Sequence, residues 1–594
     1  MSGNRNEIDE KFKWDLGKMY SNKEELDEDM SFVEKSCESI EKYKGNMSES
    51  ADKLYMTLKI MEDASRKLSN LYCYTQMKHH EDTRINENLS DATKSEMLEA
   101  KFSKATSFVI PEIISMDEKI LEDYLKDDRI KHYENMIKEM LRTKPHTLTE
   151  KEEAIMAGLS DIANVSENTY DMLCYADMKF PEITDENGEK VQLNHGNYSV
   201  YIESTDPRVR KEAFEAEFST YKKYLNTMAT TLFGAIKSEV FEAATRKYPS
   251  AIYATLFADN ISLDVYDNLI KSVNENIPSL CRYIELKKKY LKIEKMHMYD
   301  LYVPMVRDLK IKIPFDKAKE IILKALEPMG EYYISLIKKA FDERWIDVYE
   351  NDGKMGGAYS WGSYDSDPYI LMSYNDDLGS MFTLIHELGH SMHSYLSHKS
   401  QPYIYSSYKT FVAEVASTVN ETLLIKYLLE NANTKEEKIY YLNYYLEQFR
   451  TTVYRQTLFA EFEKTTHATV EAGNPITADE FTNIFLELNK KYYGKACKVD
   501  EMIGVEWARI PHFYSNFYVY KYATGFSAAS VLSDKILNEE GAVDKYMEFL
   551  KSGGSDYPLN QLLKAGVDMR KKESVDKALK IFEEKVDELE ELIK

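Results

Sequence analysis

The sequence predicts a mostly α-helical protein with a large hydrophobic core. Only 22 glycines and 14 prolines interrupt 594 residues, so long amphipathic segments dominate, and residues 20–160 have the pattern of successive long helices. Hydrophobic residues make up 43% of the chain, with 45 tyrosines and 24 phenylalanines, which is ample for a core and excludes wholesale disorder. The length corresponds to about four domain-sized units or to one large multi-lobed protein.

A short strand-rich segment is expected between residues 178 and 203, where the helical period stops. Its turn residues, Asp185–Gly188, are followed by β-forming side chains that extend through 198–202, which is typical of a small hairpin or meander. Helical sequence resumes just afterwards. We therefore expect a boundary near residue 205, with an N-terminal helical domain over 1–205 that ends in this hairpin and a second domain over 206–594.

A second strand-rich patch precedes the most informative helix of the chain. Residues 356–361 and 368–374 are aromatic and apolar and are bounded by turn residues, which predicts a hairpin. The acidic turn at 375–377 then supplies an N-cap for a helix over about 378–398. The chain ends in a charged amphipathic helix over about 574–594, which we expect at the surface.

The helix over 378–398 contains the motif His386-Glu387-Leu-Gly-His390. Histidines four apart project from the same face of a helix, so both imidazoles can reach one metal ion. Glu387 is offset by one residue, where a general base would take a proton from water activated by the metal. The motif interrupts an otherwise buried face, where unpaired polar groups are costly. That face consists of Met381, Phe382, Ile385 and Leu388.

A catalytic zinc site needs at least one further protein ligand. A histidine six residues after His390 is excluded, because that position is Leu396. The helix that starts near residue 409 instead offers Glu414 and Glu421, seven residues apart on one face among valines and alanines. We interpret Glu414 as the ligand, since carboxylates seldom stay in apolar surroundings without a compensating positive charge. The alternative is that Glu414 pairs with an arginine.

His393 lies three residues beyond the second histidine of the motif. It therefore points near the predicted metal but away from the face that carries both ligands. We interpret it as a residue that supports the ligands or lies on the substrate side, and simple packing remains the alternative.

The motif and the later glutamate resemble those of the thimet-oligopeptidase-like zinc metallopeptidases, and among them the bacterial oligoendopeptidase F branch. The glutamate of Phe-Val-Ala-Glu414-Val-Ala-Ser-Thr follows the last histidine of HELGH by 24 residues. Further matching segments, in family order, cover most of the chain: Trp14-Asp-Leu, Arg246-Lys-Tyr-Pro-Ser-Ala251, Gly357-Ala-Tyr-Ser360, Pro368-Tyr-Ile-Leu-Met372, Ile510-Pro-His-Phe-Tyr514 and Tyr520-Lys-Tyr-Ala-Thr-Gly525.

This resemblance implies a large two-lobed helical zinc metallopeptidase with a deep central channel and a small β hairpin or sheet beside the HExxH helix. It makes 206–594 the catalytic peptidase domain and His386, His390 and Glu414 the ligands of one Zn²⁺ per chain. Glu421 is then expected to orient a ligand histidine.

The resemblance also suggests two substrate-binding segments. In related enzymes a histidine and spaced tyrosines near the C-terminus donate hydrogen bonds to the oxyanion, and His512, Tyr518 and Tyr522 are the matching residues. Gly525 falls where some relatives have a further tyrosine. The strand that holds Ala358, Tyr359 and Trp361 is expected to bind the backbone of an extended peptide by β-addition.

The sequence therefore predicts a zinc endopeptidase that acts on short oligopeptides. A dipeptide-releasing carboxypeptidase of the same clan is the main alternative, and a non-catalytic helical peptide-binding protein or one with a structural zinc is a further one. An aminopeptidase is disfavoured because the chain has no GxMEN segment for a free amine. The oligomeric state is left open.

Charge and cysteine content narrow the possible partners and the compartment. The net charge of −24 argues against nucleic acid and against anionic membranes. Neither an N-terminal apolar segment nor any run of about 18 apolar residues is present. The 5 cysteines are scattered and form no CxxC pair, which indicates reduced thiols. We therefore expect a cytoplasmic protein.

Overall fold

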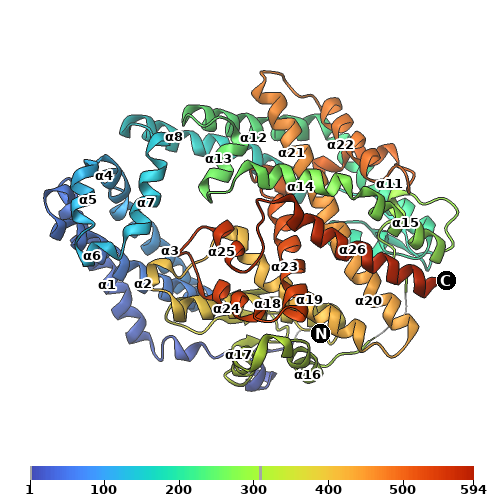
Figure 1. Cartoon of the computed structure of the whole chain (residues 1–594), viewed down its shortest axis with the longest axis horizontal. Helices are drawn as coiled ribbons and strands as arrows, with labels where there is room; N and C mark the ends of the chain where they lie inside the picture. Colours follow the sequence, from blue (N-terminus) through green and yellow to red (C-terminus); the bar gives the residue numbers. More distant parts are fainter. Residues whose placement is uncertain (1–2, 307–310) are drawn as a thin grey trace. The chain divides into compact units, whose positions relative to one another are not determined.

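The computed structural model describes residues 3–306 and 311–594, and α-helices dominate it as the sequence predicts (Figure 1). Two compact units are present, one from residues 1–145, 310–424 and 532–566 and the other from residues 146–309, 425–531 and 567–594. Residue 205, the boundary expected from the sequence, lies inside the second unit. Each unit is held together by contacts between segments that are distant in the chain, and a local change of pattern in the sequence does not report such contacts. No helix among the described residues combines the length and apolarity needed to cross a membrane.

The first unit contains a helical N-terminal region and the helices around the HExxH motif. Its α-helices are α1 (Lys23–Ile40), α2 (Ala51–Glu81), α3 (Asn86–Thr106), α4 (Val109–Ser115), α5 (Glu118–Tyr124), α6 (Asp128–Lys131), α7 (Glu134–Thr143), α16 (Phe315–Ala325), α17 (Gly330–Asp342), α18 (Leu378–Ser400), most of α19 (Thr410–Glu430), α24 (Ala542–Lys551) and α25 (Pro558–Lys564).

The second unit is also helical. Its α-helices are α8 (Glu150–Ala163), α9 (Val165–Asp171), α10 (Tyr198–Ile202), α11 (Pro207–Lys223), α12 (Leu225–Thr245), α13 (Ala251–Ala258), α14 (Leu263–Glu275), α15 (Ile277–Tyr290), α20 (Lys435–Gln448), α21 (Arg455–Glu471), α22 (Ala478–Tyr493), most of α23 (Tyr520–Asn538) and α26 (Lys572–Ile593).

The motif helix α18 begins where the sequence predicts. The side chain of Asp377 caps it by accepting a hydrogen bond from the Ser380 backbone N–H at 2.7 Å. Apolar side chains recur along one face at helical spacing and are fully buried: Met381, Leu384, Ile385, Leu388 and Met392. Through its length α18 packs against α16, α17 and α24 and against a small sheet (Figure 1).

That sheet has three strands in the order β3-β5-β4. The predicted hairpin is confirmed as β4 (Tyr359–Trp361) and β5 (Tyr369–Leu371), which pair antiparallel with Ser360 opposite Ile370. A parallel strand, β3 (Ile346–Asp347), adds to the far side of β5 and was not predicted. Two residues are too short to show a period of two in the sequence. Strand β4 therefore lies at an edge of the sheet, beside α18.

The strand-rich segment after residue 178 is only partly as predicted. A hairpin is present as β1 (Glu182–Thr184) and β2 (Lys190–Gln192). The expected strand over 198–202 is wrong, because these residues form the short helix α10. Tyr198 and Ile202 are buried four residues apart, which is the spacing of one helix face, and the aromatic and β-branched composition of the segment concealed it.

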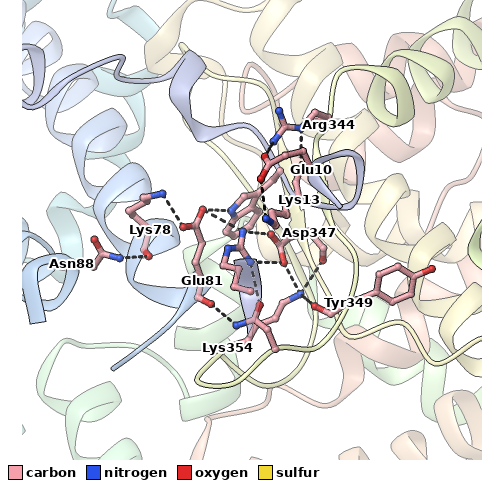
Figure 2. A network of polar contacts seen from close by, with 12 residues as sticks. Glu10, Lys13, Lys78, Glu81, Asn88, Arg344, Asp347, Tyr349 and Lys354 are labelled. Atoms are coloured by element: carbon pink, nitrogen blue, oxygen red, sulfur yellow. Dashed lines mark hydrogen bonds and ion pairs between the residues drawn. The ribbon is translucent and has the colours of Figure 1, made fainter. Parts of the chain in front are cut away.

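A buried charge network fastens the three-stranded sheet to the surrounding chain (Figure 2). The Lys354 ammonium is fully buried and lies 2.6 Å from the carboxylate of Asp347, at the end of β3. It also donates to the backbone carbonyls of Tyr349 at 2.7 Å and of Met372 at 2.6 Å. Arg5 approaches the same carboxylate at 3.1 Å. One lysine thus satisfies groups from both β3 and the residue after β5.

We predict that Lys354→Met destabilises the first unit by about 3–5 kcal/mol, because it leaves buried carbonyls without a donor and removes one partner of a buried ion pair. Urea denaturation followed by circular dichroism measures the change. Lys78→Met is the matched control: Lys78 pairs with Glu81 at 2.8 Å but its side chain is 41% exposed, so the expected loss is below about 1 kcal/mol. Equal losses in both variants would contradict the structural importance of the network.

Candidate metal centre and peptide-binding strand

The two histidines of the motif converge on one point. His386 and His390 project from the same face of α18, and their Nε2 atoms lie 3.1 Å apart. From α19, Glu414 places its Oε2 atom 3.5 Å from the Nε2 of His386 and 3.7 Å from the Nε2 of His390. Among the described residues, these three form the one group of His, Cys, Asp and Glu side chains whose ligand atoms lie close enough together to hold a metal ion.

The spacing of these atoms suits zinc. Ligand atoms about 2.0–2.2 Å from a tetrahedral zinc ion are separated by about 3.3–3.6 Å, and the three distances here run from 3.1 to 3.7 Å. Two imidazoles and one carboxylate are also the donor set of catalytic zinc sites, which keep a fourth position open. The Glu414 side chain is 41% exposed, so the cluster is accessible from outside.

Glu421 lies about two turns of α19 beyond Glu414 and accepts a hydrogen bond from the Nδ1 atom of His386. A carboxylate only accepts, so Nδ1 carries the proton and Nε2 faces Glu414. Burial alone would lower the pKa of His386, but this hydrogen bond and the neighbouring carboxylates outweigh burial and raise that pKa to about 9. Burial lowers the pKa of His390 to about 3, with the charge of His386 as a second cause. The carboxylates of Glu387, Glu414 and Glu421 thus attract positive charge to His386.

Gly389 allows α18 and α19 to approach closely enough to build this cluster. A Cβ atom added to Gly389 would lie 2.5 Å from the Cα atom of Ser417 and 2.8 Å from the carbonyl oxygen of Ala416. Glu414 and Glu421 lie three residues before and four residues after Ser417 on α19, and His386 and His390 lie three residues before and one residue after Gly389 on α18. No role for Gly389 was predicted from the sequence, although a glycine between two ligands on a buried helix can indicate close packing of a second helix.

Asn420 adds a second link between these helices, which the sequence analysis also missed. Its side-chain amide donates to the carbonyl of Ile385 on α18 at 3.3 Å, and its oxygen accepts from the Tyr333 hydroxyl at 2.9 Å. Both Asn420 and Tyr333 are completely buried. The carbonyl that precedes the first ligand histidine is therefore held by α19, so the helix register at the motif is restrained.

Glu387 lies beside the metal cluster and does not belong to it. Its side chain is buried, with 7% of the residue exposed. Burial raises the pKa of Glu387 to about 7; His386 opposes that shift, and the Glu414 carboxylate adds to it. The Ser360 backbone N–H on β4 also hydrogen-bonds Glu387 and lowers its pKa. Glu387 is thus a buried carboxyl group at the junction of the metal cluster and the edge strand.

The register of β4 corrects one detail of the predicted peptide-binding strand. The backbone N–H groups of Ile370 and Met372 donate to the carbonyls of Trp345 and Asp347, on the β3 side of β5. The backbone groups of Tyr369 and Leu371 therefore point to the other side, toward β4. Tyr359 and Trp361 lie opposite these two residues, so their backbone groups face β5. The backbone groups on the open edge belong to Ser360 and, two residues earlier, to Ala358. Ser360, rather than Tyr359 and Trp361, thus presents backbone groups at the edge that an extended peptide could reach.

His393 packs away from the ligand atoms. Its ring stacks on Tyr408 with centroids 3.6 Å apart and also contacts Phe549. Burial lowers the pKa of His393 to about 3, and its Nδ1 atom has no hydrogen-bond partner among the described residues. Of the roles that the sequence left open, these contacts favour packing.

The C-terminal residues His512, Tyr518 and Tyr522 form a cluster within the second unit. The Tyr522 hydroxyl lies 3.3 Å from the Nε2 atom of His512, and the Tyr518 and Tyr522 rings meet edge to face with centroids 5.3 Å apart. Burial and the positive charge of Arg455 lower the pKa of His512. Its imidazole is therefore neutral near pH 7 and able to donate one hydrogen bond.

Tyr514 does not join this cluster, although the sequence places it in one helical row with Tyr518 and Tyr522. Its hydroxyl hydrogen-bonds Thr231 at 2.7 Å, and its ring packs on Tyr170. The chain is irregular between residue 514 and the start of α23, so the row is interrupted there. Phe517 in this stretch has a positive φ of 48°.

All five cysteines are buried and none forms a disulfide. This agrees with the reduced thiols expected from their scattered positions.

Comparison with known proteins yields a consistent set of relatives. A family model described as Peptidase family M3 matches residues 200–581, and one described as Oligopeptidase F matches residues 112–180. Oligopeptidase PepF of Bacillus subtilis is 46% identical over 99% of this chain and 88% of its own length. Group B oligopeptidase PepB of Streptococcus agalactiae is 39% identical over 100% of this chain and 99% of its own.

A solved structure is similar as well. The crystal structure of oligoendopeptidase-F from Enterococcus faecium superposes with a TM-score of 0.75 and 38% sequence identity, over 96% of this chain and 99% of that chain. The similarity therefore extends through both units.

We predict that Gly389→Ala lowers stability by about 1–3 kcal/mol and weakens zinc binding, because the new methyl group forces α18 and α19 apart. Thermal unfolding and competition with a zinc chelator measure the two effects. Gly379→Ala in the first turn of α18 is the matched control, since its Cβ would meet only a side-chain oxygen at 3.5 Å. A Gly389→Ala protein that is as stable as the Gly379→Ala protein would show that the close approach is dispensable.

We predict different outcomes for the two glutamates of α19. Glu414→Ala should abolish tight zinc binding because it removes a ligand atom. Glu421→Ala should weaken binding about 10–100-fold, as is typical when the residue that orients a ligand histidine is removed. Metal analysis after dialysis, with the exposed Glu430→Ala as control on the same helix, measures both. The reverse order of effects would assign the ligand role to Glu421.

Proposed function

This chain belongs to peptidase family M3, with oligopeptidase F as its matching branch, and we propose that it is a zinc-dependent endopeptidase that cleaves internal bonds of short, unstructured oligopeptides. The observation that carries the proposal is the convergence of His386, His390 and Glu414 within 4.8 Å, with the buried carboxyl group of Glu387 beside them. A purely structural zinc site would need a fourth protein ligand and would have no use for that carboxyl group.

In this proposal, His386, His390 and Glu414 hold one zinc ion, which supplies Lewis acidity at the scissile carbonyl when bound. Glu387 accepts a proton from the attacking water and passes it to the leaving amine. Its partly buried position supports this role, because a carboxyl group with a pKa near 7 can both accept and donate a proton near neutral pH. Glu421 holds His386 in the tautomer that ligates through Nε2.

The edge strand β4 is proposed to align the substrate. An extended peptide can add to the open edge of β4 by pairing with the carbonyl of Ser360 and with the backbone groups of Ala358. The Ser360 N–H also contacts Glu387, so a peptide bound there would lie next to the proposed general base. Folded proteins have no free extended segment to add, since their edge strands are paired or protected. This argument supports short, unstructured peptides as the substrate class.

The oxyanion is proposed to receive hydrogen bonds from His512 and from Tyr522 or Tyr518. The family resemblance carries this assignment. The neutral state of the His512 imidazole and its contact with the Tyr522 hydroxyl are compatible with it.

We predict that the protein cleaves an internally quenched oligopeptide blocked at both ends, that a zinc chelator stops the reaction, and that Glu387→Gln retains zinc but loses about 10²–10⁴-fold in kcat. Fluorescence, metal analysis and mass mapping of the products measure the three results. Release of dipeptides from unblocked peptides only would instead identify a carboxypeptidase. A metal-free or fully active Glu387→Gln protein would overturn the role of that residue.

We predict that His512→Ala and Tyr522→Phe lower kcat by about 10²–10³-fold if each is a principal oxyanion donor, with zinc content unchanged. Tyr514→Phe is the matched control, because the Tyr514 hydroxyl is occupied by Thr231. Steady-state kinetics separate the possibilities: a rise in KM with unchanged kcat would place the residue in ground-state substrate binding.

A further inference from the structure

The second unit contains a cavity of about 260 Å³ that is lined by residues from α10, α11, α21 and α22 and from the turns around Tyr302 and Glu506. All its lining residues belong to this unit, and none is a member of the metal cluster. Its volume lies below the roughly 300–1,000 Å³ that is usual for sites of drug-sized ligands. It would therefore accommodate a molecule of about the size of one amino acid or a small dipeptide.

Three arginines line this cavity, and their carboxylate partners use only part of their hydrogen-bonding capacity. Arg450 donates through Nε and Nη2 to Glu447 at 2.8 and 2.6 Å. Arg455 donates through Nη2 to Glu506 at 2.7 Å, and Arg509 donates through Nε to Glu217 at 3.1 Å. A guanidinium group carries five N–H donors, so each arginine has donors beyond those used in these hydrogen bonds; Arg509 also lies 3.8 Å from Glu506 through Nη1.

These guanidinium groups are held in place before any ligand binds. Arg450 lies over the ring of Tyr302 at 4.7 Å, Arg455 over Phe459 at 4.4 Å and Arg509 over Tyr198 at 5.0 Å. Stacking of this kind fixes the plane of the donors. The Arg450 side chain is only 1% exposed, and that of Arg455 is 18% exposed. The guanidinium groups of Arg450 and Arg455 therefore lie at depth, each paired with a glutamate, Glu447 and Glu506.

The mouth of the cavity is different in character. Ser199 and Glu203, four residues apart at α10, line the cavity and are both exposed. Glu203 thus offers a carboxylate at the entrance. The walls are apolar and include Phe214, Phe218 and Leu458, all nearly completely buried. The cavity combines a deep end where guanidinium donors are paired with glutamates, an exposed carboxylate at Glu203 and apolar walls.

We propose that this cavity binds a small zwitterion, namely a free amino acid or dipeptide with an apolar side chain. Arg455, together with Arg450, receives the carboxylate, Glu203 receives the ammonium group, and the aromatic and aliphatic walls receive the side chain. A simple inorganic anion would use neither the acidic rim nor the apolar walls. Such zwitterions are the chemical class that peptide hydrolysis releases, but the proposal stands on the cavity alone and does not require the proposed peptidase mechanism.

The first test is calorimetric titration of the full chain with L-leucine, N-acetyl-L-leucine, L-leucinamide and inorganic phosphate, before and after zinc removal by chelation. The proposal expects saturable leucine binding that survives zinc removal, with weaker binding of both blocked forms. It is overturned if leucine does not bind, if phosphate binds and leucine does not, or if chelation abolishes the leucine signal, which would place leucine at the metal. Failure of the proposed peptidase activity would leave these outcomes unchanged.

The second test uses variants at the rim and at depth. Glu203→Gln should weaken leucine about 10-fold, the loss of one charge-assisted hydrogen bond, and should leave N-acetyl-L-leucine unchanged because that probe has no ammonium group. Arg455→Lys should weaken both. Ser199→Trp should block the entrance, whereas Val200→Trp, at the neighbouring exposed position outside the cavity lining, should not. Equal effects of the two tryptophan variants, or equal loss of both probes in Glu203→Gln, would overturn the proposal.

Discussion

The candidate metal site depends on the close approach of α18 and α19 at Gly389. With no side chain there, the backbone of Ala416 and Ser417 lies against α18 at a distance that no Cβ atom could occupy. On α18 the two histidines are four residues apart and share one helix face, and on α19 the two glutamates are seven residues apart and share another. The two histidines, Glu414 and Glu421 meet for that reason, and the buried link from Asn420 to Ile385 prevents the helices from sliding past each other.

Buried charge is compensated locally throughout the first unit. At the candidate metal centre, three glutamates surround the imidazoles, and the raised pKa of His386 reflects the attraction for a positive charge. Under the adjacent sheet, Lys354 and Arg5 neutralise Asp347 and bind the ends of β3 and β5 (Figure 2). An unpaired charge would be costly at either place. Lys354 thus ties β3 to the end of β5, the strand with which β4 pairs.

Long periodic segments of the sequence predict their secondary structure better than short ones. The helix over 378–398, its cap at Asp377 and its buried face are evident in the sequence because twenty residues repeat one period. Segment 198–202 was predicted as a strand because four of its five residues are aromatic or β-branched and suit either a strand or a helix, and only their burial distinguishes the two. Strand β3 is shorter still. Tyr514, Tyr518 and Tyr522 have helical spacing in the sequence, but an irregular turn separates Tyr514 from α23.

The sequence by itself determined the mostly helical class, the candidate ligands and base, and the family resemblance, since each rests on residue identity and local spacing. Only the tertiary structure decided which backbone groups of β4 are open, because that depends on the neighbour that β5 supplies on each side. It also decided that a glycine sets the distance between α18 and α19, and that arginines, tyrosines and two glutamates from segments far apart in the chain line a single cavity. Contacts between residues far apart in the chain leave no periodic trace in the sequence, so physical reasoning on local patterns could not have found them.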